Sequence, residues 1–156
     1  MKSGFKTVCI GIVVLVAILC GYFGFITYLN EKVAFKVKYD STEGYRCEYM
    51  EDFYYTSHPA TIISPVSSLT AVKSVQTEGE DIEIDFIVTY EKKLFGKDII
   101  YLQTSCEEHE EYLICEEFEN TEQLIEECDD DTIRALLVEN NHTIDFLMEK
   151  INNRVQ

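Results

Sequence analysis

The hydrophobic pattern begins with an apolar run from Thr7 to Leu29 that contains no charged residue across its 23 positions. A helix rises about 1.5 Å per residue, so a run of this length crosses a hydrocarbon core roughly 30 Å thick. The pattern therefore predicts a short cytoplasmic tail over residues 1–6, a transmembrane signal anchor over 7–29 and an extracytoplasmic domain over 30–156.

Three other kinds of N-terminal segment fit this run less well. A cleaved signal peptide has an apolar region of about 7–15 residues followed by a small-residue cleavage site, and neither is found here. A lipoprotein signal would acylate Cys20, but Leu19 stands where a small residue is expected. The opening Met1–Phe5 resembles the leader of type IV pilin-like proteins, which are cut between Gly and Phe. Cys9 replaces the Glu that this family carries five residues after the cut. An uncleaved anchor is therefore the preferred interpretation.

Beyond the anchor, apolar and polar residues alternate with a period of two, which is typical of half-buried strands. The clearest example runs from Asp81 to Glu91, where Ile87 is the one apolar residue on the polar face. Pro59 breaks an earlier run, and Gly96 suits a hairpin loop because it tolerates a positive φ. The predicted strands cover residues 33–39, 45–49, 53–55, 61–64, 69–76, 81–91, 99–104 and 112–118, with turns over 40–44, 77–80, 92–97 and 107–111.

After residue 118 the period becomes helical. Asn120 or Thr121 is suited to cap a short helix, and Asp129–Asp131 can end that helix and cap the next. Apolar residues at helical spacing follow, and they are Leu124, Ile125, Cys128, Ile133, Leu136, Leu137, Ile144, Leu147, Met148, Ile151 and Val155. Strands first and helices after them predict an α+β fold: an N-terminal transmembrane helix, then an antiparallel β-sheet with C-terminal helices packed on one face.

The charge balance is strongly acidic beyond the anchor. All 29 acidic residues lie there with 11 of the 13 basic ones, which gives a formal charge of −18. Between Glu107 and Asp131 there are 13 acidic residues and no Lys or Arg. Such a surface repels nucleic acid and attracts a basic protein, although solubility alone also explains it. We expect partner binding at Glu107, Glu108, Glu110, Glu111, Asp129, Asp130 and Asp131.

Four cysteines lie outside the apolar run, and an even number in a short extracytoplasmic domain predicts two disulfides. These cysteines are Cys47, Cys106, Cys115 and Cys128. Three pairings are open. A Cys106–Cys115 clip across an acidic hairpin turn, with a Cys47–Cys128 link, is slightly favoured.

Other chemistry has weaker support in the sequence. Cys106, His109, Cys115 and Cys128 form a C-x2-H-x5-C-x12-C pattern that suits zinc only in a reducing compartment. The acidic residues lack the spacing of a calcium loop. No catalytic motif occurs, and carboxylate pairs are too numerous to single one out. We therefore expect no catalytic residue, no metal site and no cofactor.

These observations predict a membrane-anchored binding protein, most specifically an acidic inhibitor or immunity-type protein that neutralises a basic protein partner at the bacterial inner membrane, facing the periplasm. The flanking lysines do not decide the orientation, because Lys2 and Lys6 precede the run while Lys32, Lys36 and Lys38 follow it. The cysteine number, the acidity and the short tail place the domain outside. The alternatives are an envelope assembly component and a small hydrolase that uses an acidic pair.

Overall fold

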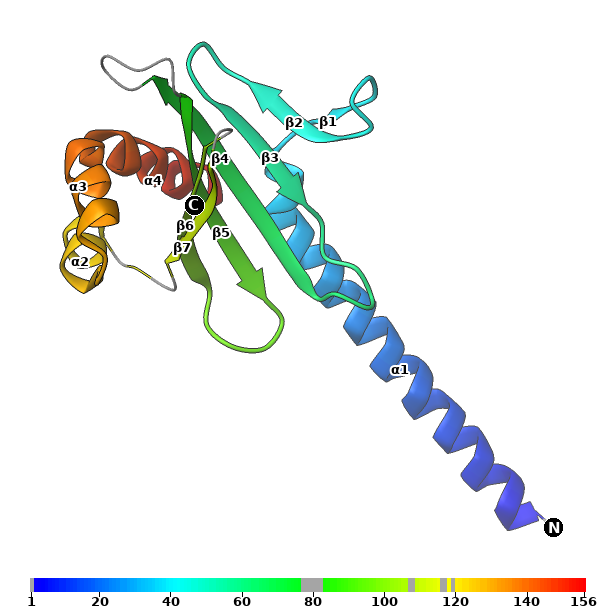
Figure 1. The fold of residues 1–156 in the computed structure, drawn as a ribbon. Coiled ribbons are helices and arrows are strands. Elements are labelled where there is room, and N and C mark those ends of the chain that lie inside the picture. Colours follow the sequence, from blue (N-terminus) through cyan, green and yellow to red (C-terminus); the bar gives the residue numbers. More distant parts are fainter. Residues whose placement is uncertain (1, 77–82, 107–108, 116–117, 119) are drawn as a thin grey trace.

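One long helix dominates the N-terminal part of the protein. The computed structural model describes residues 2–76, 83–106, 109–115, 118 and 120–156. Helix α1 (Lys2–Lys32) projects from a mixed domain of strands and shorter helices (Figure 1). Its segment Val8–Lys32, 25 residues long, is long and apolar enough to cross a membrane. The predicted span, residues 7–29, lies inside this helix.

The domain is built on a seven-stranded antiparallel sheet in which every strand pairs with its neighbour in the sequence. The two longest strands pair in register from Val66–Lys93 to Gln76–Glu83 and form the centre of the sheet. The strands are β1 (Tyr39–Asp40), β2 (Tyr45–Tyr49), β3 (Tyr54–His58), β4 (Val66–Gln76), β5 (Glu83–Lys93), β6 (Ile99–Cys106) and β7 (His109–Cys115).

Three helices follow the sheet and lie on one side of it, where α4 packs directly against β4 and β5 (Figure 1). They are α2 (Thr121–Glu127), α3 (Asp131–Glu139) and α4 (Asn141–Val155). The Asn120 side chain accepts a hydrogen bond from the Gln123 N–H, and Asp130 accepts from the N–H groups of Thr132 and Ile133. Both caps were predicted, and both supply acceptors for backbone donors that the first turn of a helix leaves without partners.

The core lies between this face and α4. Phe86 and Val88 of β5 belong to the same buried cluster as Leu147 and Ile151 of α4. Successive strand residues point to opposite faces, so the predicted alternation on β5 places its apolar residues toward the helices. The predicted α+β architecture, with an N-terminal apolar helix, an antiparallel sheet and C-terminal helices, is confirmed.

The predicted strand over residues 33–39 is wrong. Residues Ala34–Lys36 form a 3₁₀ turn, η1, and only Tyr39–Asp40 pair as β1. Val33 and Val37 are buried, but Phe35 and Tyr39, which the alternation placed on the same face, are exposed, and Ala34 is fully buried. Burial at residues 33, 34 and 37 fits one side of a helical turn, where residues three and four apart lie together. The backbone continues from α1 through this turn, where the Val33 N–H donates to the Leu29 carbonyl.

Two other local predictions also need correction. Residues 61–64 form a turn rather than an edge strand, because the Thr61 N–H donates to the Ser64 carbonyl and the Ser64 N–H donates to the Thr61 hydroxyl. The turn expected over 107–111 is wrong for residues 109–111, which belong to β7, and its residues 107–108 lie outside the described residues. The turn predicted over 77–80 lies outside the described residues.

The C-terminal helix is tied to both the sheet and the segment after α1. Arg154 forms an ion pair with Glu48 of β2, donates to the Lys36 carbonyl at 3.2 Å and stacks over the Tyr55 ring at 4.7 Å. The Tyr55 hydroxyl donates to the Lys150 carbonyl. The end of α4 is thereby fixed beside the juxtamembrane turn.

We expect the Arg154–Glu48 pair to be energetically coupled, because both side chains are about three-quarters buried and their charges are poorly screened. A double-mutant cycle with Arg154→Met and Glu48→Gln should give a coupling of about 1 kcal/mol or more, measured by urea unfolding. The matched control is the pair Arg134–Asp131, whose carboxylate is 94% exposed. Its coupling should stay below about 0.5 kcal/mol. Equal couplings for the two pairs would contradict this interpretation.

Candidate functional site

The helical layer presents an acidic surface. Every carboxylate between residues 120 and 156 is exposed. There are nine of them, and they lie on α2, α3, α4 and the joint between α2 and α3. We call them the acidic layer, and they are Glu122, Glu126, Glu127, Asp129, Asp130, Asp131, Glu139, Asp145 and Glu149.

The basic residues of this segment do not balance the acidic layer, because each of the three is only partly exposed and engaged within the domain. Arg134 pairs with Asp131 at 2.9 Å and donates to the Cys128 carbonyl. The Lys150 ammonium lies 4.7 Å from the centre of the Phe146 ring. Arg154 pairs with Glu48, as described above. Most of the negative charge of the layer therefore faces solvent.

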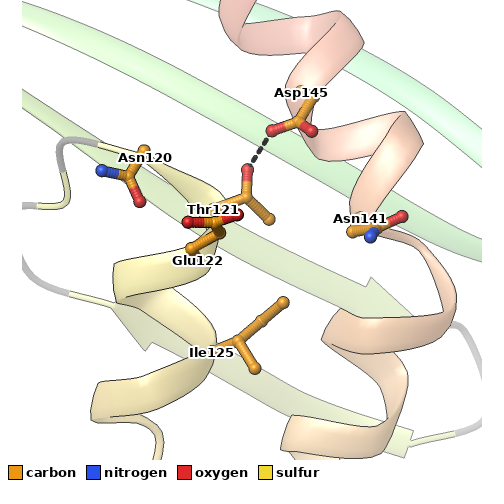
Figure 2. Close-up of a pocket in the computed structure, with 6 residues that line it drawn as sticks. All are labelled: Asn120, Thr121, Glu122, Ile125, Asn141 and Asp145. Carbon is orange, nitrogen blue, oxygen red and sulfur yellow. Dashed lines mark hydrogen bonds between the residues drawn. The ribbon is translucent and has the colours of Figure 1, made fainter.

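A small polar pocket lies within this surface, between the beginnings of α2 and α4. Its volume is about 280 Å³. Figure 2 shows the Thr121 hydroxyl donating to the Asp145 carboxylate across the pocket. Its lining combines two carboxylates, two amides, one hydroxyl and one apolar side chain, from Asn120, Thr121, Glu122, Ile125, Asn141 and Asp145. Such a lining offers mainly hydrogen-bond acceptors, which suit a cationic group.

The predicted partner-binding residues do not all come together. Asp129, Asp130 and Asp131 lie in the acidic layer. However, the Asp130 carboxylate caps α3, and the Asp131 carboxylate forms an ion pair with Arg134. Residues Glu110 and Glu111 lie within β7. Glu107 and Glu108 lie outside the described residues. The pocket residues Glu122 and Asp145 were missed, because only the fold brings α2 beside α4.

Neither favoured disulfide is present in the described structure. The β6–β7 register pairs Cys106 with His109 and Cys115 with Leu102. Cys115 therefore lies six strand residues beyond the partner of Cys106, or about 20 Å away. A disulfide needs Cα atoms within about 7 Å of each other. The predicted Cys106–Cys115 clip is wrong because the register of the two strands does not place these residues opposite one another.

The Cys47–Cys128 link is also wrong, and both residues are free thiols. Cys47 pairs with Thr56, the neighbour of Tyr55, whose ring packs into the core under α4. Directly paired residues share a face and consecutive residues alternate, so Cys47 lies on the face away from the helices. Cys128 ends α2 on the helix-covered side. The sheet therefore separates the two sulfurs.

The β6–β7 register also argues against the zinc site suggested by the Cys and His spacing. The separation of Cys115 from Cys106 and His109 is too large for one tetrahedral zinc ion. Within the part of the chain that the structure describes, no group of three His, Cys, Asp or Glu residues is placed to hold a metal ion.

Three carboxyl groups in the described part of the chain have a shifted pKa, and each shift is downward. Hydrogen bonds from backbone N–H groups lower the pKa of Asp40, and a hydrogen bond from Lys73 lowers the pKa of Asp52. Burial raises the pKa of Asp98, but hydrogen bonds from Lys92 and Tyr90 outweigh it, and the net shift is downward. A general acid at neutral pH needs a raised pKa, so none of these three supports the hydrolase alternative.

A cluster of exposed apolar side chains, which was not predicted, lies at one end of the sheet. Ile62 and Ile63, in the β3–β4 connection, are 57% and 96% exposed, and Phe95 in the β5–β6 connection is 81% exposed. We call these three residues the apolar tips. The sequence feature that could have indicated this cluster is the pair of isoleucines between Pro59 and Pro65. These isoleucines were instead assigned to the predicted edge strand.

Comparison with known proteins adds no functional assignment. No family model, no curated protein and no solved structure matches the chain. The function must therefore be argued from the acidic layer, its pocket and the long apolar helix.

Proposed function

We propose that this protein is a membrane-anchored binding protein whose acidic layer captures a basic protein. The observation that carries the proposal is the imbalance of the helical segment, where nine exposed carboxylates face three basic residues that are engaged internally. Oppositely charged surfaces accelerate encounter and select partners by charge.

The pocket gives this surface a specific point of contact. Glu122 and Asp145 approach it from two different helices (Figure 2). A lysine or arginine side chain that enters the pocket meets carboxylate and amide oxygens, and charge-assisted hydrogen bonds are stronger than neutral ones. The partner's cationic side chain is the proposed ligand of this pocket.

Membrane anchoring through α1 fits an inhibitor that intercepts a basic protein at a membrane surface. The specific form of the proposal is an immunity-type inhibitor on the outer side of a bacterial inner membrane. The disulfide argument for that side no longer applies, because the described structure does not form the predicted pairs. The acidic charge of the domain supports this placement.

The test uses the full chain in lipid nanodiscs and an oligo-arginine peptide as the probe. Glu122→Gln combined with Asp145→Asn should weaken peptide binding about tenfold, since two charge-assisted contacts are lost. The matched control is Glu43→Gln with Glu51→Gln, which removes the same charge from exposed positions outside the helical layer. Control binding should change by less than about twofold, and wild-type affinity should fall as salt is added.

Equal losses in both double variants would mean that the probe senses net charge alone, and the pocket would have no role. Unchanged affinity in the pocket variant, or affinity independent of salt, would overturn the proposal.

A further inference from the structure

The apolar tips lie beside the long helix rather than on a free edge of the domain. The β3–β4 and β5–β6 connections are at the same end of the sheet, and the Leu94 N–H donates to the Pro65 carbonyl between them. Figure 1 shows that α1 projects from this end. Ile26 and Leu29 of α1 pack with Ala60 of the first connection and Leu94 of the second.

Polar contacts fix the depth of the β3–β4 connection along α1. Asn30 exchanges two hydrogen bonds with the backbone of Ala60, at 2.6 and 3.0 Å. Further down the helix, the Tyr22 hydroxyl donates to the Ile62 carbonyl at 2.7 Å. Tyr22 precedes Asn30 by eight residues, so the connection follows the helix for about 12 Å toward its N-terminus.

This depth brings the apolar tips to the level of the apolar helix segment. A hydrocarbon core takes roughly 20 helical residues, and a span that begins at Val8 ends near Thr27. Tyr22 then lies roughly 8 Å on the membrane side of that end. Side chains held at this level by Tyr22 do not face bulk water when α1 crosses a bilayer.

The backbone of the β3–β4 connection is suited to an apolar environment at the membrane boundary. Polar backbone groups are costly in lipid unless they are paired within the protein. Here both backbone groups of Ala60, both of Ser64, the Thr61 N–H and the carbonyls of Ile62 and Pro65 have hydrogen-bond partners. These paired groups flank Ile62 and Ile63, whose apolar side chains are exposed.

The β5–β6 connection carries its own support. Gly96 has a φ of +111°, which turns the chain directly after Phe95. Asp98 accepts hydrogen bonds from Tyr90 and Lys92, both at 2.7 Å, and so fixes the root of the loop. Lys97 is exposed next to the tip, where an ammonium group can reach lipid phosphates while Phe95 lies deeper.

We propose that Ile62, Ile63 and Phe95 form a lipid-docking surface, which inserts into the headgroup–hydrocarbon boundary of the bilayer that α1 spans. The inference rests on the proposed membrane anchoring and does not depend on the partner of the acidic layer. The occupant of this surface is lipid, because the surface is continuous with the apolar helix and lies at its depth.

The chain contains no tryptophan, so one introduced tryptophan is a unique reporter of depth. The full chain is reconstituted in phosphatidylcholine vesicles whose acyl chains carry bromine close to the headgroup, a short-range quencher. Ile63→Trp and Phe95→Trp are the test variants. Phe23→Trp reports on α1 itself, which is exposed at this position, and Tyr49→Trp on β2 is the exposed control away from the apolar tips.

We expect brominated lipid to reduce the fluorescence of Ile63→Trp and Phe95→Trp to about half, with blue-shifted emission, because interfacial tryptophan sits at this depth. Phe23→Trp should also be quenched, while Tyr49→Trp should keep its intensity and emit as in water.

If either tip variant behaves like Tyr49→Trp while Phe23→Trp is quenched, the lipid-docking surface is refuted and the membrane anchor stands. If Phe23→Trp is also unquenched, α1 does not enter the bilayer, and both the docking and the anchoring proposals fail. Circular dichroism of each variant verifies that the fold is retained.

Discussion

Phe86→Ala is expected to reduce the free energy of unfolding by about 3–5 kcal/mol, the largest effect of any single substitution considered. Phe86 is fully buried on β5, opposite Lys73 on β4 and Thr104 on β6. Its ring belongs to the cluster that joins the sheet to α4. Alanine leaves a cavity that rigid strands on both sides cannot close.

The measurement is urea unfolding of the full chain in detergent, followed by near-ultraviolet circular dichroism of the domain's tyrosines. A loss of this size is comparable to the whole stability of many domains, so Phe86→Leu serves as a milder variant with an expected loss of about 1.5 kcal/mol. The matched control is Phe95→Ala, whose side chain is 81% exposed. It should change stability by less than about 0.5 kcal/mol. Similar losses at the two phenylalanines would contradict the described core.

Asn30→Leu is expected to cost roughly 2–4 kcal/mol, although leucine has the same branched arrangement of side-chain heavy atoms and favours a helix. The Asn30 amide donates to the Ala60 carbonyl and accepts from the Ala60 N–H, and both residues are buried. Leucine leaves two buried backbone groups of Ala60 without partners. The cost of an unmade buried hydrogen bond exceeds the gain from one made bond.

Hydrogen exchange at the Ala60 amide provides a local readout, and its protection should fall by much more than that of the β4 and β5 amides. Asn152→Leu is the control, since that side chain is exposed on α4 and its substitution should leave both stability and exchange nearly unchanged. Preserved protection at Ala60 in Asn30→Leu would show that the helix does not fix the β3–β4 connection.

Much of the fold could be predicted because local patterns and tertiary packing agree. The alternation on β5, the helical spacing of Ile144, Leu147 and Ile151, and the acceptors at Asn120 and Asp130 each point to the element that forms. The strand predicted after Leu29 was wrong for a physical reason. Buried residues at 33 and 37 fit either a strand or a helical turn, and the direct continuation from α1 selects the turn.

The candidate site was less predictable, since it depends on which elements meet. Spacing suggested that Cys106 and Cys115 could form a disulfide, yet the register of β6 and β7 pairs Cys106 with His109 and Cys115 with Leu102. The acidic residues at 129–131 were identified from composition and the cap at Asp130 was predicted, but the ion pair between Asp131 and Arg134 was not. The pocket and the apolar tips arise from contacts between distant segments, which have no signature in a single stretch.

The helix α1 enters the domain without a flexible linker, and this has a mechanical consequence. The Val33 N–H donates to the Leu29 carbonyl, and Ala34 is held by hydrogen bonds to Ser67 and Ser57. The orientation of the helix is therefore coupled to that of the sheet. A transmembrane helix adjusts its tilt to the thickness of the bilayer. With α1 in a bilayer, a change in membrane thickness would swing the whole domain and alter the direction in which the acidic layer faces its neighbours.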